Sequence, residues 1–328
     1  MQDKNKKRIY LDHAAATPLD ARVYDAMEPY LKEEFGNAGG LYREGRRAKD
    51  ALDDARARVA GILGARPEEI IFTSGGTEGD TLALFGIARV YADKGKHIIT
   101  TSIEHHAVLS ACEALQKEGF EVTYLSVKEN GILDPEKLKG ALRPDTILVS
   151  IMYANNEIGT VQPIDEIARV ICEHRKTQNT QLPIFHTDAC QAAGYLNLRV
   201  DNLGVDLLVL NGTKIYGPNG VGALYLRRGI RLKPLFYGGP QEGRRRAGTE
   251  NVAGIVGLAR ALEITHEEKA EEVGRLIELR DLLISEIQKR IPRTVLNGDR
   301  ENRLPNNVNI SILDIEGEAV ILYLDAYG

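Results

Sequence analysis

The chain has 328 residues, enough for one large domain and a smaller one. Its composition, 43% hydrophobic and 27% charged residues with a net charge of −5, is ordinary for a globular protein and argues against a dedicated nucleic-acid binder. Cys112, Cys172 and Cys190 lie far apart, so neither a disulfide framework nor a metal site is expected. The polar start MQDKNKKRIYLD and the lack of long apolar runs predict a cytoplasmic protein without a signal peptide or membrane contact.

Helical patterns and short apolar strands alternate along most of the chain. Two amphipathic helices are expected within residues 21–63, and further helices at residues 79–95 and 164–177. Strands are predicted at EEIIFTS, HIITTS, FEVTYLSV, DTILVSIMY, LPIFHTD and VDLLVL, with another strand-like run after Gly222. This alternation predicts an α/β fold whose mostly parallel sheet is covered on both faces.

The pattern changes after about Val252. A long charged helix is expected over residues 258–291, followed by two short strands and a helix at 317–328. We therefore expect a large α/β domain over residues 15–260. A smaller α+β domain would combine residues 1–14 with 261–328, and with two strands and so few helices we expect it to be incomplete at its C-terminal end.

The residues that follow the strands are candidates for a site, because ligands of α/β proteins bind beyond the carboxyl ends of the strands. Gly75-Gly76-Thr77 follows the first strand and begins a helix, where free N–H groups and a hydroxyl suit a phosphate; the alternative is an ordinary helix start. The other strand ends carry Glu104-His105-His106, Asn155-Asn156-Glu157, Asp188 with Gln191 one turn later, and Lys214.

Lys214 follows the buried strand VDLLVL and precedes a glycine-rich turn. A lysine held there tends to lose its proton, and a neutral amine can form a Schiff base with a carbonyl; the alternative is a surface lysine. His105 could equally be a structural histidine and Asp188 a helix cap. Together these residues meet the needs of pyridoxal 5′-phosphate: an amine, a phosphate site, a carboxylate for the ring nitrogen and a flat group for the ring face. No G-x-G-x-x-G follows the first strand, which disfavours a dinucleotide site.

The ordered motifs resemble those of the cysteine desulfurases, class V aminotransferase-like pyridoxal-phosphate enzymes of fold type I. The resemblance runs from residue 9 to about 325. It is carried by YLDHAAATPLD, TSGGTEGDTLAL, EHHAVL, NNEIGTVQPI, HTDACQ, KIYGPNGVGALY and GGPQEGRRRAGTENV.

The resemblance implies a role for each candidate residue. Lys214 would bind the cofactor covalently and act as the catalytic base, Asp188 would pair with the ring nitrogen, and His105 would stack on the ring and assist proton transfer. Gln191 and Asn156 would lie near the phenolic oxygen. The phosphate would be held by Gly76, Thr77, Asn211, Thr213 and, from the partner subunit of a homodimer, Thr249.

Two departures from the family pattern stand out. The family has Ser-x-His-Lys where this chain has Asn211-Gly212-Thr213-Lys214, so an imidazole is replaced by a hydroxyl. The loop with the persulfide cysteine and the arginine for the substrate carboxylate have no counterpart here. A chain ending at Gly328 is therefore expected to bind cofactor but to desulfurate cysteine poorly, with its three cysteines acting as small buried hydrophobic residues.

The implied function is removal of sulfur from L-cysteine, giving L-alanine and a protein-bound persulfide for iron–sulfur cluster or thio-cofactor assembly. A sulfur acceptor or iron–sulfur scaffold protein would be the partner. Two enzyme alternatives share the cofactor residues, a selenocysteine lyase and a class V aminotransferase. A scaffold that binds cofactor without turnover is a third alternative.

Overall fold

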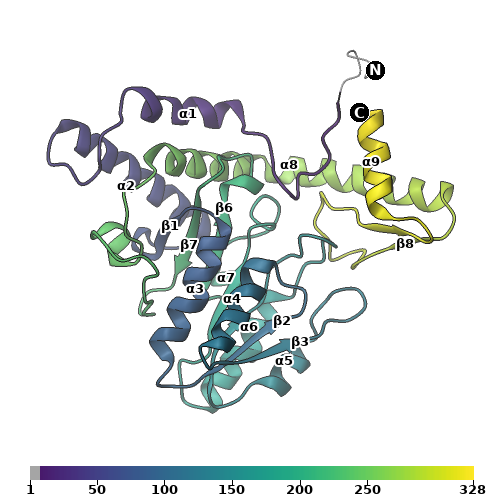
Figure 1. Ribbon diagram of the computed structural model, residues 1–328, viewed down its shortest axis with the longest axis horizontal. Coiled ribbons are helices and arrows are strands. Elements are labelled where there is room, and N and C mark those ends of the chain that lie inside the picture. The colour runs from purple at the N-terminus through teal and green to yellow at the C-terminus, as the bar shows by residue number, and fades with distance from the viewer. Residues whose placement is uncertain (1–7) are drawn as a thin grey trace.

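The computed structural model describes residues 8–328, and a seven-stranded sheet lies at its centre (Figure 1). The strands are β1 (Ile70–Thr73), β2 (His97–Thr101), β3 (Glu121–Leu125), β4 (Thr146–Ser150), β5 (Ile184–Asp188), β6 (Leu207–Asn211) and β7 (Gly222–Leu226). Their order is β1-β7-β6-β5-β4-β2-β3, and only β7 pairs antiparallel with its neighbours. The predicted α/β fold with a mostly parallel sheet is confirmed.

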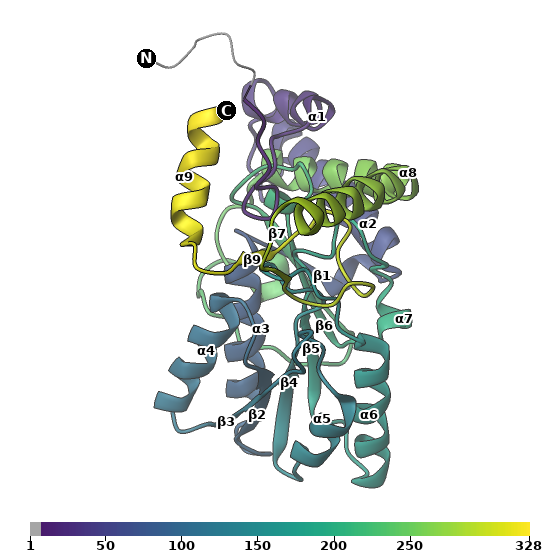
Figure 2. The ribbon, with the colours of Figure 1, turned by 90° about the vertical axis from the view of Figure 1, so that its right-hand side faces the viewer.

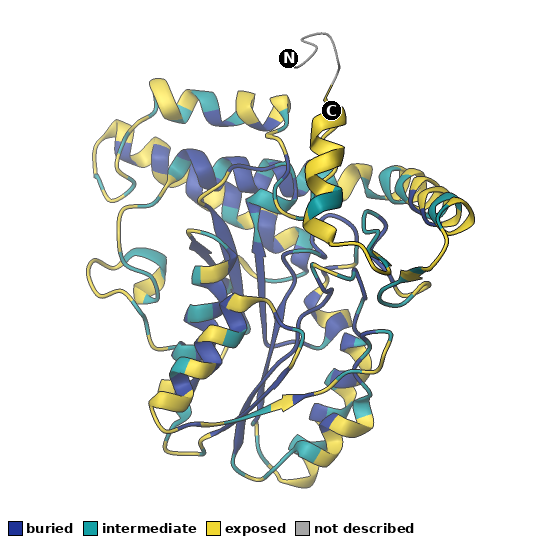
Figure 3. Cartoon of the chain, turned by 45° about the vertical axis from the view of Figure 1, so that its right-hand side comes forward, coloured by how far each residue is buried: buried dark blue, intermediate teal, exposed yellow. Residues whose placement is uncertain are grey.

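Helices cover both faces of this sheet, which therefore has two cores. On one face lie α3 (Gly76–Tyr91) and α4 (His106–Lys117). The other face is covered by α1 (Ala21–Lys32), α2 (Arg43–Leu63), α5 (Pro135–Ala141), α6 (Ile164–Thr177), α7 (Val200–Leu203) and the start of α8 (Val252–Arg290). Alternate strand residues enter opposite cores, as the two-residue period of a strand requires; Ile70 and Phe72 point to one core and Ile71 to the other. Figure 3 shows the buried strands between exposed helix faces.

The long helix α8 connects this body to the C-terminal elements. Its first turns are buried against α1 and α2, whereas beyond Ile264 only Arg280 and Ile284 are buried. The antiparallel pair β8 (Thr294–Leu296) and β9 (Ile310–Ile312) follows, then the exposed helix α9 (Gly317–Tyr327) (Figures 1 and 2). The proposed domain boundary at residue 260 falls inside α8, so the division into two domains stays a prediction.

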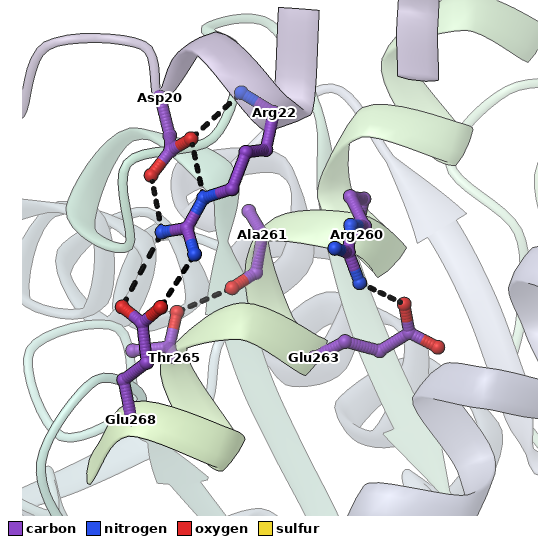
Figure 4. A network of polar contacts seen from close by, with 7 residues as sticks. All are labelled: Asp20, Arg22, Arg260, Ala261, Glu263, Thr265 and Glu268. Atoms are coloured by element: carbon purple, nitrogen blue, oxygen red, sulfur yellow. Dashed lines mark hydrogen bonds and ion pairs between the residues drawn. The ribbon is translucent and has the colours of Figure 1, made fainter. Parts of the chain in front are cut away.

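An ion-pair network joins α1 to α8. Arg22 donates to Asp20, the N-cap of α1, with 2.8 Å between Nη2 and Oδ2, and its Nη1 lies 2.5 Å from Glu268 Oε1 on α8 (Figure 4). Because Arg22 is half exposed, the network contributes little to global stability. It links the start of α1 to α8.

The expectation that the three cysteines are buried is confirmed for two of them and is wrong for the third. Cys112 and Cys190 are buried, but Cys172 is exposed. The amphipathic helix α6 explains the difference: Ile164, Ile167 and Ile171 face the core, and the residue after Ile171 points about 100° away. Over residues 8–328 no helix is long and apolar enough to span a membrane, and no group of three or more His, Cys, Asp or Glu residues could hold a metal ion.

Candidate active site

A cavity of about 630 Å³ opens where the predicted strand ends meet. Nine of the ten residues proposed from the sequence line it: Gly76, Thr77, His105, Asn156, Asp188, Gln191, Asn211, Thr213 and Lys214. The tenth, Thr249, lies outside and borders a separate hollow of about 100 Å³ together with Ser74 and Arg246. The strand topology therefore brings together side chains that are far apart in the sequence.

The start of α3 forms one wall of the cavity. Gly75 has a φ of +152°, which residues with a side chain rarely adopt, and the helix has no side-chain N-cap. A Cβ on Gly76 would lie 2.8 Å from Cys190 Sγ, so only glycine lets this turn approach the segment after β5 so closely. The N–H groups of the first turn have no partner within the helix and are available to an anion.

Lys214 occupies the opposite wall, in a short 3₁₀ helix (Gly212–Lys214) after β6. It is half buried, and burial lowers the pKa of its ammonium, as expected from its place after a buried strand. Its Nζ donates to the carbonyl of Ala15, and Gln191 Nε2 donates to the carbonyl of Ala14 at 2.9 Å. The N-terminal segment around residues 12–17 is thus part of the cavity wall, which the strand-end argument did not predict.

His105 has the structural role that the sequence left open as an alternative, whereas the helix cap considered for Asp188 is wrong, because Asp188 caps a turn and the next helix begins only at Val200. Asp188 Oδ1 accepts from the Cys190 N–H at 2.9 Å. His105 is the N-cap of α4, with Nδ1 accepting from the Ala107 N–H at 3.1 Å. Both side chains nevertheless line the cavity, so capping holds them in fixed positions facing a ligand.

Two buried carboxyls near the cavity are not among the ten residues to which the sequence analysis gave a role; Glu104 appeared there only as a strand-end residue, and Asp80 did not appear. Asp80 lines the cavity from α3, four residues after Gly76, a spacing that places both on one face of the helix and could have identified it. Glu104 precedes His105; its Oε1 accepts from Thr101 Oγ1 at 2.6 Å and from the Met152 N–H at 3.0 Å. Glu104 therefore ties the loop after β2 to the loop after β4.

Glu104 makes stability depend on pH. Burial raises its pKa from 4.5 to about 8, so its stabilising contribution is complete below the unfolded-state pKa and is lost as pH rises through about 8. We expect wild type, relative to Glu104→Gln, to lose on the order of 3–5 kcal/mol between pH 5 and 9. Urea unfolding of the cofactor-free proteins across this range measures the difference. The exposed Glu136→Gln is the control, and pH curves that run parallel for wild type and Glu104→Gln would contradict the assignment.

Comparisons with known proteins place the chain in a family. It matches the aminotransferase class-V family over residues 9–328. A solved NifS-like protein superposes with a TM-score of 0.92 at 36% identity, covering 98% of this chain and 90% of that one. Fold and family together define a class V aminotransferase-type enzyme of fold type I, a class that depends on pyridoxal phosphate.

Individual relatives show which family within this class the chain belongs to. The chain is 52% identical over 323 residues to the cysteine desulfurase IscS of Dictyoglomus turgidum, covering 98% of this chain and 80% of that protein. It is 51% identical over 322 residues to the cysteine desulfurase IscS of Methanosarcina thermophila, with 98% and 78% covered. The chain belongs to the cysteine desulfurase family.

Proposed function

We propose that the cavity binds pyridoxal 5′-phosphate and that Lys214 and Asp188 carry the reaction on L-cysteine. The observation behind this proposal is that a half-buried lysine with a lowered pKa, a buried carboxylate and the uncapped start of α3 line one cavity. Adding the cofactor and then L-cysteine, with alanine and sulfide as the measured products, tests it. A visible band without alanine formation would favour the scaffold alternative.

The residues present fit the cofactor. The start of α3, with Gly76 and Thr77, would hold the phosphate, together with Asn211 and Thr213. Asn211 Oδ1 accepts hydrogen bonds and is buried without a partner among residues 8–328, so a contact with the phosphate would have to come from the NH2 group of the same amide. Asp188 would pair with the ring nitrogen and His105 would lie against the ring face.

The remaining polar groups would act near the phenolic oxygen and the substrate. Gln191 holds the carbonyl of Ala14, and the Asn156 side chain reaches only Glu157, with 3.0 Å between Nδ2 and Oε1. A bound cofactor would supply an electron sink conjugated to the Cα of the substrate. Lys214 Nζ, which burial makes easier to deprotonate, would accept the Cα proton of cysteine, and His105 would assist its movement.

Cysteine is the substrate that the family assigns, and a relative of known structure supports it. That structure, titled SspA in complex with cysteine, superposes with a TM-score of 0.83 at 36% identity, covering 98% of this chain and 87% of that one. Selenocysteine cleavage or amino transfer would need the same cofactor residues, so the site residues do not separate these reactions from desulfuration. Product analysis distinguishes the three reactions. A sulfur acceptor or iron–sulfur scaffold protein is the proposed partner.

A homodimer would complete the phosphate site. The segment of residues 242–249, which carries Thr249, is held on its own subunit by two ion pairs. Arg246 Nε lies 2.8 Å from Glu78 Oε1, and Glu242 accepts from both Nη atoms of Arg56 at 2.7 Å. Thr249 does not line its own cavity, which leaves the cavity of a second copy as its proposed place.

Mixed dimers test this proposal through cofactor retention. If Thr249 crosses, a dimer of one Lys214→Ala chain and one Thr249→Ala chain has one site with both lesions and one intact site. We expect that intact site to retain cofactor better than the sites of either mutant homodimer. Retention equal to the average of the two homodimers would contradict the crossing.

A further inference from the structure

A carboxyl–imidazole pair that the proposed chemistry does not use lies beneath the cavity. Asp80 on α3 is 1% exposed and His186 on β5 is fully buried. Asp80 Oδ1 lies 3.4 Å from His186 Nε2, and neither atom has a hydrogen-bond partner. Unpaired buried polar atoms are costly, so two of them facing each other need an explanation.

Packing keeps the two groups facing each other. A Cβ on Gly79 would lie 2.8 Å from Val209 Cγ1, so the turn of α3 that carries Asp80 is pressed against the sheet. On the other side of the imidazole, Nδ1 lies 2.8 Å from Ser150 Oγ on β4. Asp80 Oδ1 and His186 Nε2 are both buried, and Ser150 restricts rotation of the ring.

The charges around the pair determine where a proton resides. Burial, then the charges of Asp188 and Glu104, raises the pKa of Asp80 well above its usual range, and burial lowers the pKa of His186 to about 3. The neighbouring Cys190 thiol also has a raised pKa because it is buried. Lys214, the one lysine of residues 8–328 that lines the cavity, follows β6. Both shifts favour the uncharged forms of the pair, with the proton on the carboxyl.

We propose that Asp80 is a positioning residue that donates its proton to His186 Nε2, leaving Asp188 as the ionised carboxyl at the bottom of the cavity. The imidazole is then held in the Nδ1–H tautomer, which donates to Ser150 Oγ. A proton between Asp80 Oδ1 and His186 Nε2 gives each of these two unpaired atoms a hydrogen-bond partner. The consequence for catalysis rests on the proposed function: a single anion, rather than two, faces the ring nitrogen of the cofactor.

Isotope-edited infrared spectroscopy tests the proton on Asp80 directly. In cofactor-free protein labelled with ¹³C-aspartate, the C=O stretch of a protonated acid is distinct from carboxylate bands. We expect this band at pH 7 in wild type and in the matched control Asp188→Asn, and its loss in Asp80→Asn. Absence of the band from wild type, or its loss in Asp188→Asn but not in Asp80→Asn, would overturn the proposal.

The tautomer of His186 provides a second test that needs no folded Asp80 variant. Seven histidines are present, and His186→Gln assigns the resonance in ¹⁵N-histidine spectra of the wild type. An Nδ1–H tautomer supports the proposal, and an Nε2–H tautomer or a charged ring contradicts it. Neither measurement needs bound cofactor, so failure of cofactor binding would refute the proposed function without affecting this result.

Discussion

Lys214→Ala is expected to abolish the yellow colour of the cofactor-loaded protein and to reduce alanine formation from L-cysteine to background. The reason is that the Lys214 amine is both the proposed attachment point and the proposed base, and within the described part of the chain, residues 8–328, no other lysine lines the cavity. Because the loss removes covalent attachment and proton transfer together, it is the largest effect we expect of any single substitution.

Borohydride reduction followed by peptide mapping is the measurement. Label is expected on Lys214 in wild type and on no lysine in the variant. Lys269→Ala is the matched control, since Lys269 is a partly buried lysine of the neighbouring cavity of about 280 Å³. Label on a different lysine in wild type would refute the assignment.

The second large effect is expected from Asp188→Asn. The amide keeps the shape and an acceptor for the Cys190 N–H, but removes the charge that would hold a proton on the ring nitrogen. Loss of one preorganised electrostatic contact of this kind lowers kcat by about 10²–10³-fold, or about 3–4 kcal/mol in the barrier.

Single-turnover kinetics with L-cysteine at saturating cofactor measures this loss separately from cofactor affinity. Asp201→Asn, at an aspartate in the first turn of α7, is the control for removing one negative charge from the protein. Turnover of Asp188→Asn equal to that of wild type would show that Asp188 serves only to cap the turn after β5.

The sequence predicted most elements because their signals are local. The helix at 164–177, the strand that ends at Asp188 and the strand before Lys214 follow from periodicity and from buried apolar runs. The antiparallel insertion of β7 between β1 and β6 was not predictable, because strand order depends on packing between distant segments.

The site residues also divide into those that local sequence patterns predict and those that depend on tertiary packing. Residues directly after strands were found, since topology brings strand ends together. Asp80 was missed although its helical spacing from Gly76 indicates the same face of α3. Ala14 and Ala15, in an irregular segment, contribute through tertiary contacts that no local pattern encodes. Exposure of Cys172 was missed because helix phase, rather than residue type, decides which face a residue occupies.

The participation of residues 12–17 in the cavity wall has a consequence for biogenesis. Thr17 donates to the carbonyl of Thr213 from both N–H and Oγ1 at 2.9 Å, so the segment before α1 docks on a segment made 196 residues later. Closing such a distant contact costs chain entropy, which makes its formation slow. During synthesis on the ribosome, residues 12–17 therefore have no docking site until residue 213 has emerged. The complete wall of the cavity cannot form before that point. Capture of the cofactor in this cavity would mark the end of folding of the α/β body.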